Sequence, residues 1–227
     1  MEGRIKQEKS NRLPFPQIGR IACGEKSEKG YPRSLDYFIA NGKYKSLFDD
    51  AYGEKPSTIQ VVFPSDDASL VCNEMYELRD DAGKLVAQGD GETFKVWSAK
   101  TSTYTKVTTN EYPDLMEMVA SKYKGREWKI TLSLTFFIPK VRGVMGLWTF
   151  TTKGSASTIP QVRDTFDAML EQNGHASGVI FDLCVKMHKS NKPGDSSRYP
   201  VVSLVPNESK ENLTMVKEAR KPIMIEG

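Results

Sequence analysis

Acidic residues occur in pairs at several predicted turns and are the first groups that could do chemistry. Asp66 and Asp67 follow the strand-like segment STIQVVFPS, and Asp90 and Glu92 lie in a GDGE turn. Carboxylates that meet in a cleft can bind Mg²⁺ or share general acid and base work. These four residues support the hypothesis of a metal-dependent nuclease or phosphotransferase. The competing interpretation is turn chemistry, since an Asp side chain readily bonds to nearby backbone N–H groups.

Histidine and cysteine are too few and too scattered to predict a catalytic or metal site. The only histidines are His175 and His188, and neither stands in a triad-like pattern. The three cysteines, Cys23, Cys72 and Cys184, form no CxxC and no zinc-binding spacing. An odd number of widely spaced cysteines is typical of free thiols in a reducing compartment. We therefore expect solvated imidazoles, no metal and no cofactor.

The segment GLWTFTTKGSASTIPQVRDTFDAML passes from a strand pattern through a Gly and Ser turn into a helical pattern. The first-turn N–H groups of such a helix could hold a phosphate of a nucleotide or of DNA. Helix capping is the simpler interpretation, with Ser157 or Thr158 as the cap and Gln161 as the capping-box partner. The chain contains neither GxxxxGK[ST] nor GxGxxG after a strand. We therefore assign this corner to the scaffold.

Basic residues gather in an N-terminal arm, in a loop region near residue 190 and in the C-terminal tail. Lysine and arginine at such places can neutralise phosphates, and Tyr104 or Tyr199 could add stacking on a single strand. The competing interpretations are a loose terminus and an ordinary solvated face. The residues that we predict to contact DNA are Arg4, Lys6, Arg12, Lys186, Lys189, Lys192 and Arg198.

The order of predicted elements indicates an α+β fold with a largely antiparallel sheet and three or four helices packed against it. Strand pairs are predicted over 18–44 and 178–206, a meander of three strands over 69–99, and single strands over 57–64, 127–138 and 147–152. Helices are predicted over 43–53, 112–124, 158–173 and 209–221. We expect a flexible basic arm over 1–17, a single domain over 18–221 with an alternative internal boundary near 110–126, and a tail over 222–227.

Composition excludes some classes of protein. No apolar run approaches the roughly 20 residues of a membrane-spanning helix, and the charged start MEGRIKQEKS is unlike a signal peptide. We therefore expect a cytoplasmic protein. The net charge of +3 permits contact with nucleic acid but is well below that of dedicated DNA-binding modules.

Four sequence blocks resemble the phage family of recombination directionality factors, the accessory partners of large serine integrases, and its uncharacterised prophage relatives. The blocks are IGRIACGEKSEKGYPRSLDYF, LVAQGDGE, LTFFIPKVRGVMGLWTFTTKGSASTI and GVIFDLCV. The most specific piece runs from a hydrophobic strand that ends in proline, through LWTFTT, to the serine-rich helix start. Together the blocks extend from about Ile18 to Leu204.

The resemblance implies a protein that is not an enzyme and that works in a bacterial host cell. Such a protein binds a large serine integrase on its attachment-site DNA and changes which pairs of sites the integrase joins. One departure concerns a cysteine cluster that family members carry between the Gly-Asp-Gly turn and the long strand. Residues 92–128 contain no cysteine here, so partner specificity is not carried over.

Two other classes of function stay open at this point. A general module for single-stranded nucleic acid or nucleoprotein would bind through a sheet face and would bind unrelated oligonucleotides in a salt-dependent manner. The nuclease or phosphotransferase hypothesis instead requires that Asp66, Asp67, Asp90 and Glu92 converge in one cleft.

Overall fold

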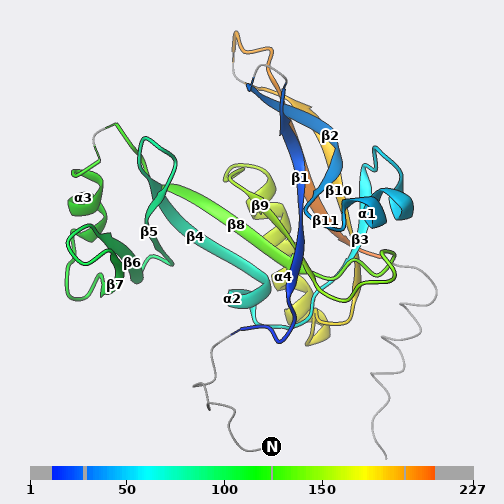
Figure 1. Cartoon of the computed structure of the whole chain (residues 1–227), viewed down its shortest axis with the longest axis horizontal. Helices are drawn as coiled ribbons and strands as arrows, with labels where there is room; N and C mark the ends of the chain where they lie inside the picture. Colours follow the sequence, from blue (N-terminus) through cyan, green and yellow to red (C-terminus); the bar gives the residue numbers. More distant parts are fainter. Residues whose placement is uncertain (1–11, 28–29, 124, 192, 208–227) are drawn as a thin grey trace, which may run out of the picture.

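The computed structural model describes residues 12–27, 30–123, 125–191 and 193–207 of the chain. This part of the chain contains two sheets and four helices (Figure 1). The larger sheet has eight strands in the order β2, β1, β9, β8, β4, β5, β6, β7. Its strands are β1 (Gln17–Lys26), β2 (Pro32–Asn41), β4 (Cys72–Arg79), β5 (Leu85–Gly89), β6 (Thr93–Ser98), β7 (Thr103–Thr108), β8 (Lys129–Phe136) and β9 (Leu147–Thr152).

The smaller sheet has three strands, in the order β11 (Arg198–Pro206), β10 (Ile180–Lys189) and β3 (Thr58–Val62). All neighbouring strands in the two sheets are antiparallel except β1 and β9, which are parallel. Strand residues make up 45% of the described residues and helical residues 18%, so the sheets dominate the architecture. The helices are α1 (Lys45–Tyr52), α2 (Ala68–Val71), α3 (Leu115–Ala120) and α4 (Thr158–Asn173).

One large apolar core joins the inner strands of the larger sheet to the smaller sheet, α1 and α4. The ring of Phe63 packs edge-on against Phe166 of α4 at 5.1 Å and against Phe181 of β10 at 5.4 Å. Phe38 of β2 packs against Phe150 of β9 at 6.2 Å. We call this region the main lobe; it comprises β1–β3, β9–β11, α1, α2, α4 and the adjoining ends of β4 and β8.

A second, smaller core lies under α3 at the other end of the larger sheet. Its ring contact joins Phe94 of β6 to Trp128 at 5.4 Å, and the Trp128 indole N–H donates to the carbonyl of Met116 in α3 at 3.0 Å. We call β5, β6, β7, α3 and the adjoining ends of β4 and β8 the outer lobe. Figure 1 shows the outer lobe standing away from the main lobe, with β4 and β8 running into both. The buried residues of this smaller core are Leu78, Val86, Ala87, Phe94, Leu115 and Val119.

The corner between β9 and α4 is held in place by buried side chains of the strand before it and of the helix after it. Trp148 is 1% exposed and its ring lies directly over Gly19 of β1, where a Cβ atom would stand 2.3 Å from the ring. Only glycine therefore allows β1 to approach β9 at this point. On α4 the predicted apolar stripe is buried at Ile159, Val162, Phe166 and Met169, and the helix ends at Gly174 in the left-handed conformation as predicted.

The α+β prediction is confirmed in outline, with a mostly antiparallel sheet and four helices, although the sheets dominate. Three details were wrong. Residues 69–71 belong to the short helix α2 instead of a strand, β7 was not predicted, and α3 begins at Leu115 instead of Tyr112. The helix predicted over 209–221 lies outside the described residues. Among the described helices, none combines the length and the apolar character that a bilayer-spanning helix requires.

Candidate interaction surface

The predicted acidic site does not assemble, because its carboxylates hold separate turns. Asp66 Oδ1 accepts hydrogen bonds from the backbone N–H groups of Ala176 and Ser177, each at 2.7 Å, and Oδ2 accepts from the Ser177 hydroxyl at 3.0 Å. Burial opposes ionisation of Asp66, but these hydrogen bonds outweigh it and lower the pKa of the carboxyl group. Asp66 thus fastens the start of α2 to the loop before β10.

The other carboxylates are also engaged locally. Asp67 caps α2 by accepting from the N–H of Ser69 at 2.9 Å. Asp90 Oδ1 accepts from the N–H groups of Thr93 at 2.7 Å and Glu92 at 2.9 Å, and these bonds lower the pKa of Asp90. Within the ranges that the structure describes, no three His, Cys, Asp or Glu side chains form a group that could hold a metal ion. The convergence that a nuclease or phosphotransferase requires is therefore not found.

The thiols and imidazoles offer no reactive pair in the described residues. Cys72 is buried, and burial together with the charges of Asp167 and Glu74 raises the pKa of its thiol to about 12. A thiol with this pKa stays protonated and is a poor nucleophile at neutral pH. His188 is exposed as expected. His175 is half-buried, and its Nδ1 is buried without a hydrogen-bond partner, so the prediction of a solvated imidazole holds only in part for this residue.

The start of α4 does not form the predicted capping box. Ser157 occupies the N-cap position without a side-chain hydrogen bond, and the Thr158 hydroxyl instead accepts from the N–H of Val202 in β11 at 3.0 Å. The carbonyl of Gly154 accepts a hydrogen bond from the N–H of Ile159 at 3.0 Å. Pro160 contributes no N–H at all, so few first-turn donors are left for a phosphate. A tertiary contact with β11 thus replaces the predicted cap, and the assignment of the corner to the scaffold stays a prediction.

The predicted basic residues near residue 190 are divided between the two faces of the β10–β11 hairpin. Lys189 is paired directly with Arg198, whereas Lys186 is paired with Val201. Because side chains alternate along a strand, Lys186 points to the opposite face from Lys189 and Arg198. All three are exposed, as is Arg12, so DNA contact by them stays a prediction. Arg4, Lys6 and Lys192 lie outside the described residues.

A row of polar side chains crosses the outer lobe on the face turned away from α3. Direct cross-strand pairs link Lys106 of β7 to Lys95 of β6, Lys95 to Gln88, Gln88 to Glu77, and Glu77 to Lys129 of β8. Directly opposite residues share a face, so the five side chains form one line across five strands. We call them the polar row. The alternate positions, such as Leu78 and Phe94, point to the small core under α3.

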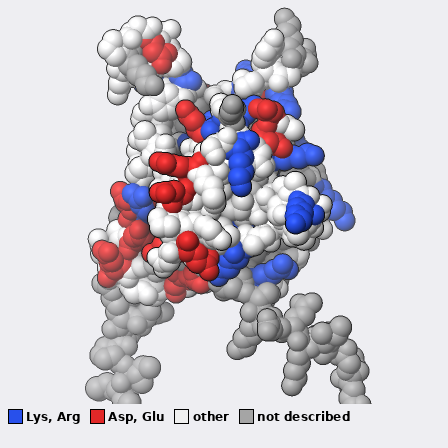
Figure 2. All heavy atoms as spheres, turned by 90° about the vertical axis from the view of Figure 1, so that its left-hand side faces the viewer, with Lys and Arg blue, Asp and Glu red and all other residues white. Residues whose placement is uncertain are grey.

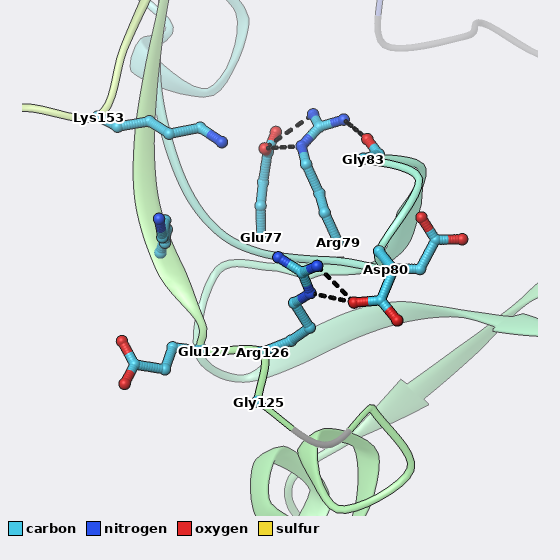
Figure 3. A pocket seen from close by; sticks show the side chains of 10 residues that line it. Glu77, Arg79, Asp80, Gly83, Gly125, Arg126, Glu127 and Lys153 are labelled. Carbon is cyan, nitrogen blue, oxygen red and sulfur yellow. Dashed lines mark hydrogen bonds and ion pairs between the residues drawn. The ribbon is translucent and has the colours of Figure 1, made fainter.

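A charged groove of about 300 Å³ lies at the Lys129 end of the polar row. Arg79 donates from Nε and Nη2 to Glu77 Oε2 at 3.1 and 2.9 Å and from Nη1 to the carbonyl of Gly83 at 3.0 Å. Across the groove, Arg126 Nε donates to Asp81 Oδ1 at 2.7 Å. Figure 3 shows Arg79 held between Glu77 and Gly83, with Arg126 and Lys153 directed toward the same space. The groove is lined by cations and carboxylates in equal number, without an arranged acid and base pair: Arg79, Arg126, Lys129 and Lys153, and Glu77, Asp80, Asp81 and Glu127.

Comparison with known proteins identifies the family of the chain. The Gp3-like family, described as recombination directionality factor-like, matches residues 18–207. The chain belongs to this family. No curated protein and no solved structure matches it. The resemblance identified from the four sequence blocks is therefore confirmed.

The match covers both lobes of this directionality factor-like chain, so the outer lobe is part of the family's domain. The outer lobe also concentrates exposed aromatic and methionine side chains. Trp97 is 36% exposed and Tyr104 45%, and their rings meet edge to face at 5.2 Å. Tyr112 and Met118 at α3 are likewise exposed. Side chains of this kind are enriched at interfaces, which makes the outer lobe a candidate for a binding surface.

Acidic and basic side chains are separated on the face of the directionality factor-like chain that carries the outer lobe. Figure 2 shows most acidic side chains on one half of this face and most basic side chains on the other. In the sequence, acidic and basic residues are interspersed, so the separation arises from folding. The polar row was missed for a related reason. The alternation in FKVW and TYTKV is visible in the sequence. Only the strand register shows that Lys95 of the first segment lies directly opposite Lys106 of the second and Gln88 of β5.

Proposed function

We propose that this protein is a phage or mobile-element accessory factor that binds a large serine integrase on attachment-site DNA and controls the direction of recombination. The observation that carries the proposal is the family match over residues 18–207. It is supported by the local use of Asp66, Asp67 and Asp90 in turns and caps, which fits a factor without catalytic activity of its own. We place its action in the cytoplasm of the bacterial host.

The geometry suggests how such a factor would act without breaking a bond. A ligand shifts a conformational equilibrium only by binding one arrangement more tightly than another. The outer lobe is joined to the main lobe by two strands of one continuous sheet, β4 and β8, so a partner that contacts both lobes meets a stiff template. Holding an integrase domain in the geometry for excision would favour the excision reaction over integration.

The proposal is tested with the large serine integrase encoded in the same phage or mobile element. Recombination between the two prophage-end sites, and between the phage and host sites, is measured with and without this protein. We expect the protein to switch on the first reaction, to inhibit the second, and to co-purify with the integrase. An integrase whose two reactions are both unchanged, and which does not retain the protein, contradicts the proposal.

A second arm of this test concerns enzymatic activity. The purified protein is incubated with Mg²⁺, nucleotides and labelled DNA, and turnover is compared with that of an Asp66→Asn, Asp90→Asn double variant. We expect no turnover by either protein. Turnover that depends on these carboxylates would replace the proposed function by catalysis.

A further inference from the structure

The open face of the outer lobe brings two lysines together without an acidic partner. Lys95 and Lys106 lie directly opposite each other on β6 and β7, where like charges destabilise a strand pair. Neither forms an ion pair with another described residue. Lys106 acts electrostatically on Asp90, but that carboxylate is already bonded to the N–H groups of Glu92 and Thr93. An anionic ligand at this place would therefore be stabilising.

A third lysine, Lys129, ends the polar row at the groove, whose lining carries carboxylates as well as cations. Glu77 is the only acidic member of the row and is 8% exposed, and Arg79 neutralises it through two hydrogen bonds. Lys129 ends the row and Lys153 lies beyond it in the groove, and neither has an ion-pair partner among the described residues. The row extends about 19 Å, because neighbouring strands lie about 4.8 Å apart. A chain of several negative charges fits this length better than a single small anion.

The aromatic pair stands on the same face, next to the lysines. Trp97 follows Lys95 by two positions on β6 and is paired directly with Tyr104 of β7. The two ring planes meet at 65°, and the Tyr104 hydroxyl donates to the carbonyl of Leu85 at 2.7 Å, which fixes the ring across the sheet. Both rings are partly exposed. A planar group can stack on a ring that is already held in place at little further cost in conformational entropy.

We propose that the open face of the outer lobe binds a single strand of nucleic acid. Its phosphates lie along Lys106, Lys95 and Lys129, and a base stacks on the pair formed by Trp97 and Tyr104. Cations that follow a backbone next to exposed aromatic rings are the combination that single strands require. An acidic protein segment would satisfy the lysines but would leave the ring faces unused. The inference goes beyond the proposed function, since it requires no integrase.

The test is fluorescence anisotropy of the full chain with an end-labelled polythymidine strand of about 15 nucleotides, within the usual range of single-strand sites. Binding is measured between about 50 and about 200 mM salt. We expect Lys95→Glu with Lys106→Glu to weaken binding at least about tenfold. The same change should lower the slope of log K against log salt by about 1.4, since each phosphate contact on a single strand contributes about 0.7. Trp97→Ala with Tyr104→Ala should weaken binding about tenfold with little change in slope.

The matched control is Lys43→Glu with Lys55→Glu, which changes the net charge equally on exposed lysines that flank α1 in the main lobe. We expect it to weaken binding by less than about threefold, because salt screens charges that lie beyond roughly 10 Å. The Lys95 and Lys106 reversals replace one like-charge pair by another, so the hairpin should still fold; Lys95→Arg with Lys106→Arg should keep the affinity.

Three outcomes would overturn the inference: no measurable binding of the strand, equal weakening by the main-lobe control, or full affinity after reversal of Lys95 and Lys106. Equal affinity for a duplex of the same sequence would refute base stacking and with it the single-strand assignment. The result is independent of the integrase experiment. A protein that binds the strand but leaves recombination unchanged refutes only the proposed function, whereas one that controls the integrase without binding the strand refutes only this inference.

Discussion

The two lobes bury the same sheet in different ways. In the main lobe, the smaller sheet and α4 contribute to one large core with the inner strands, and ring contacts such as Phe63 with Phe166 fill the space between layers. In the outer lobe, the six-residue helix α3 packs on one face, over a small core centred on Phe94. The opposite face keeps a line of polar side chains. The difference teaches that stability is concentrated in the main lobe and that the outer lobe has a free face for a partner.

The polar groups of the two lobes are used differently as well. In the main lobe, Asp66 and the Thr158 hydroxyl bind backbone N–H groups of distant segments and so hold the fold together. In the outer lobe, Lys95 and Lys106 have no such internal partner and face each other across a strand pair. Polar side chains that do not stabilise the fold are the ones most readily explained by binding.

The largest effect is expected from a cavity in the main core. Phe166 is fully buried against Phe63, and Phe166→Ala should lower the free energy of unfolding by about 3–5 kcal/mol, the usual cost of removing a buried phenyl ring. Denaturant titration followed by circular dichroism measures the loss. Both lobes should unfold together, because β4 and β8 belong to both. A loss below about 1 kcal/mol would show that α4 is loosely packed on the smaller sheet.

A matched cavity in the outer lobe should have a local effect. Phe94 is fully buried against Trp128, and Phe94→Ala should remove about 3 kcal/mol of local stability. Hydrogen exchange should then speed up in β5, β6, β7 and α3, while the amides of β10 keep their protection, because small cores open as separate units. Equal loss of protection in both lobes would contradict the comparison. Phe166→Ala serves as the control in which β10 is also affected.

The smallest effect concerns the turn carboxylates and pH. The pKa of Asp66 is lowered in the folded state, so its hydrogen bonds stabilise the fold above the unfolded value of 3.8 and are lost as the pH falls through the folded value. Asp66→Asn should cost about 1–2 kcal/mol at neutral pH, and its unfolding free energy should fall less steeply below about pH 4 than that of the wild type. For Asp90→Asn we expect a loss of stability and a change of acid dependence in the same direction, confined to the outer lobe.

These pH profiles are read from denaturant titrations for Asp66→Asn and from hydrogen exchange of β5 and β6 for Asp90→Asn. Identical acid profiles for the wild type and Asp66→Asn would show that the three hydrogen bonds to Asp66 contribute nothing to stability. An Asp90→Asn effect that spreads to β10 would show that the two lobes are coupled more tightly than their separate cores indicate.

Local patterns predicted most elements because each strand or helix is stabilised by its own periodicity. Val179, Phe181, Leu183 and Val185 alternate in the sequence and are all buried. The failures lie where a distant segment decides. The Thr158 hydroxyl binds β11 instead of capping its own helix, and His175 is placed so that its Nδ1 is buried. No local pattern contains the partner in either case.

The sequence by itself determined most of the order of strands and helices, the corner from Trp148 to Leu170, and the family, since these depend on residues close together in the chain. Tertiary structure alone decided that Lys95 and Lys106 meet and that Asp66 is bound by residues 176–177. The physical reason is strand register. A side chain alternates faces at every residue, and the neighbour it meets across a sheet is fixed by pairing over turns and long loops that local periodicity does not specify.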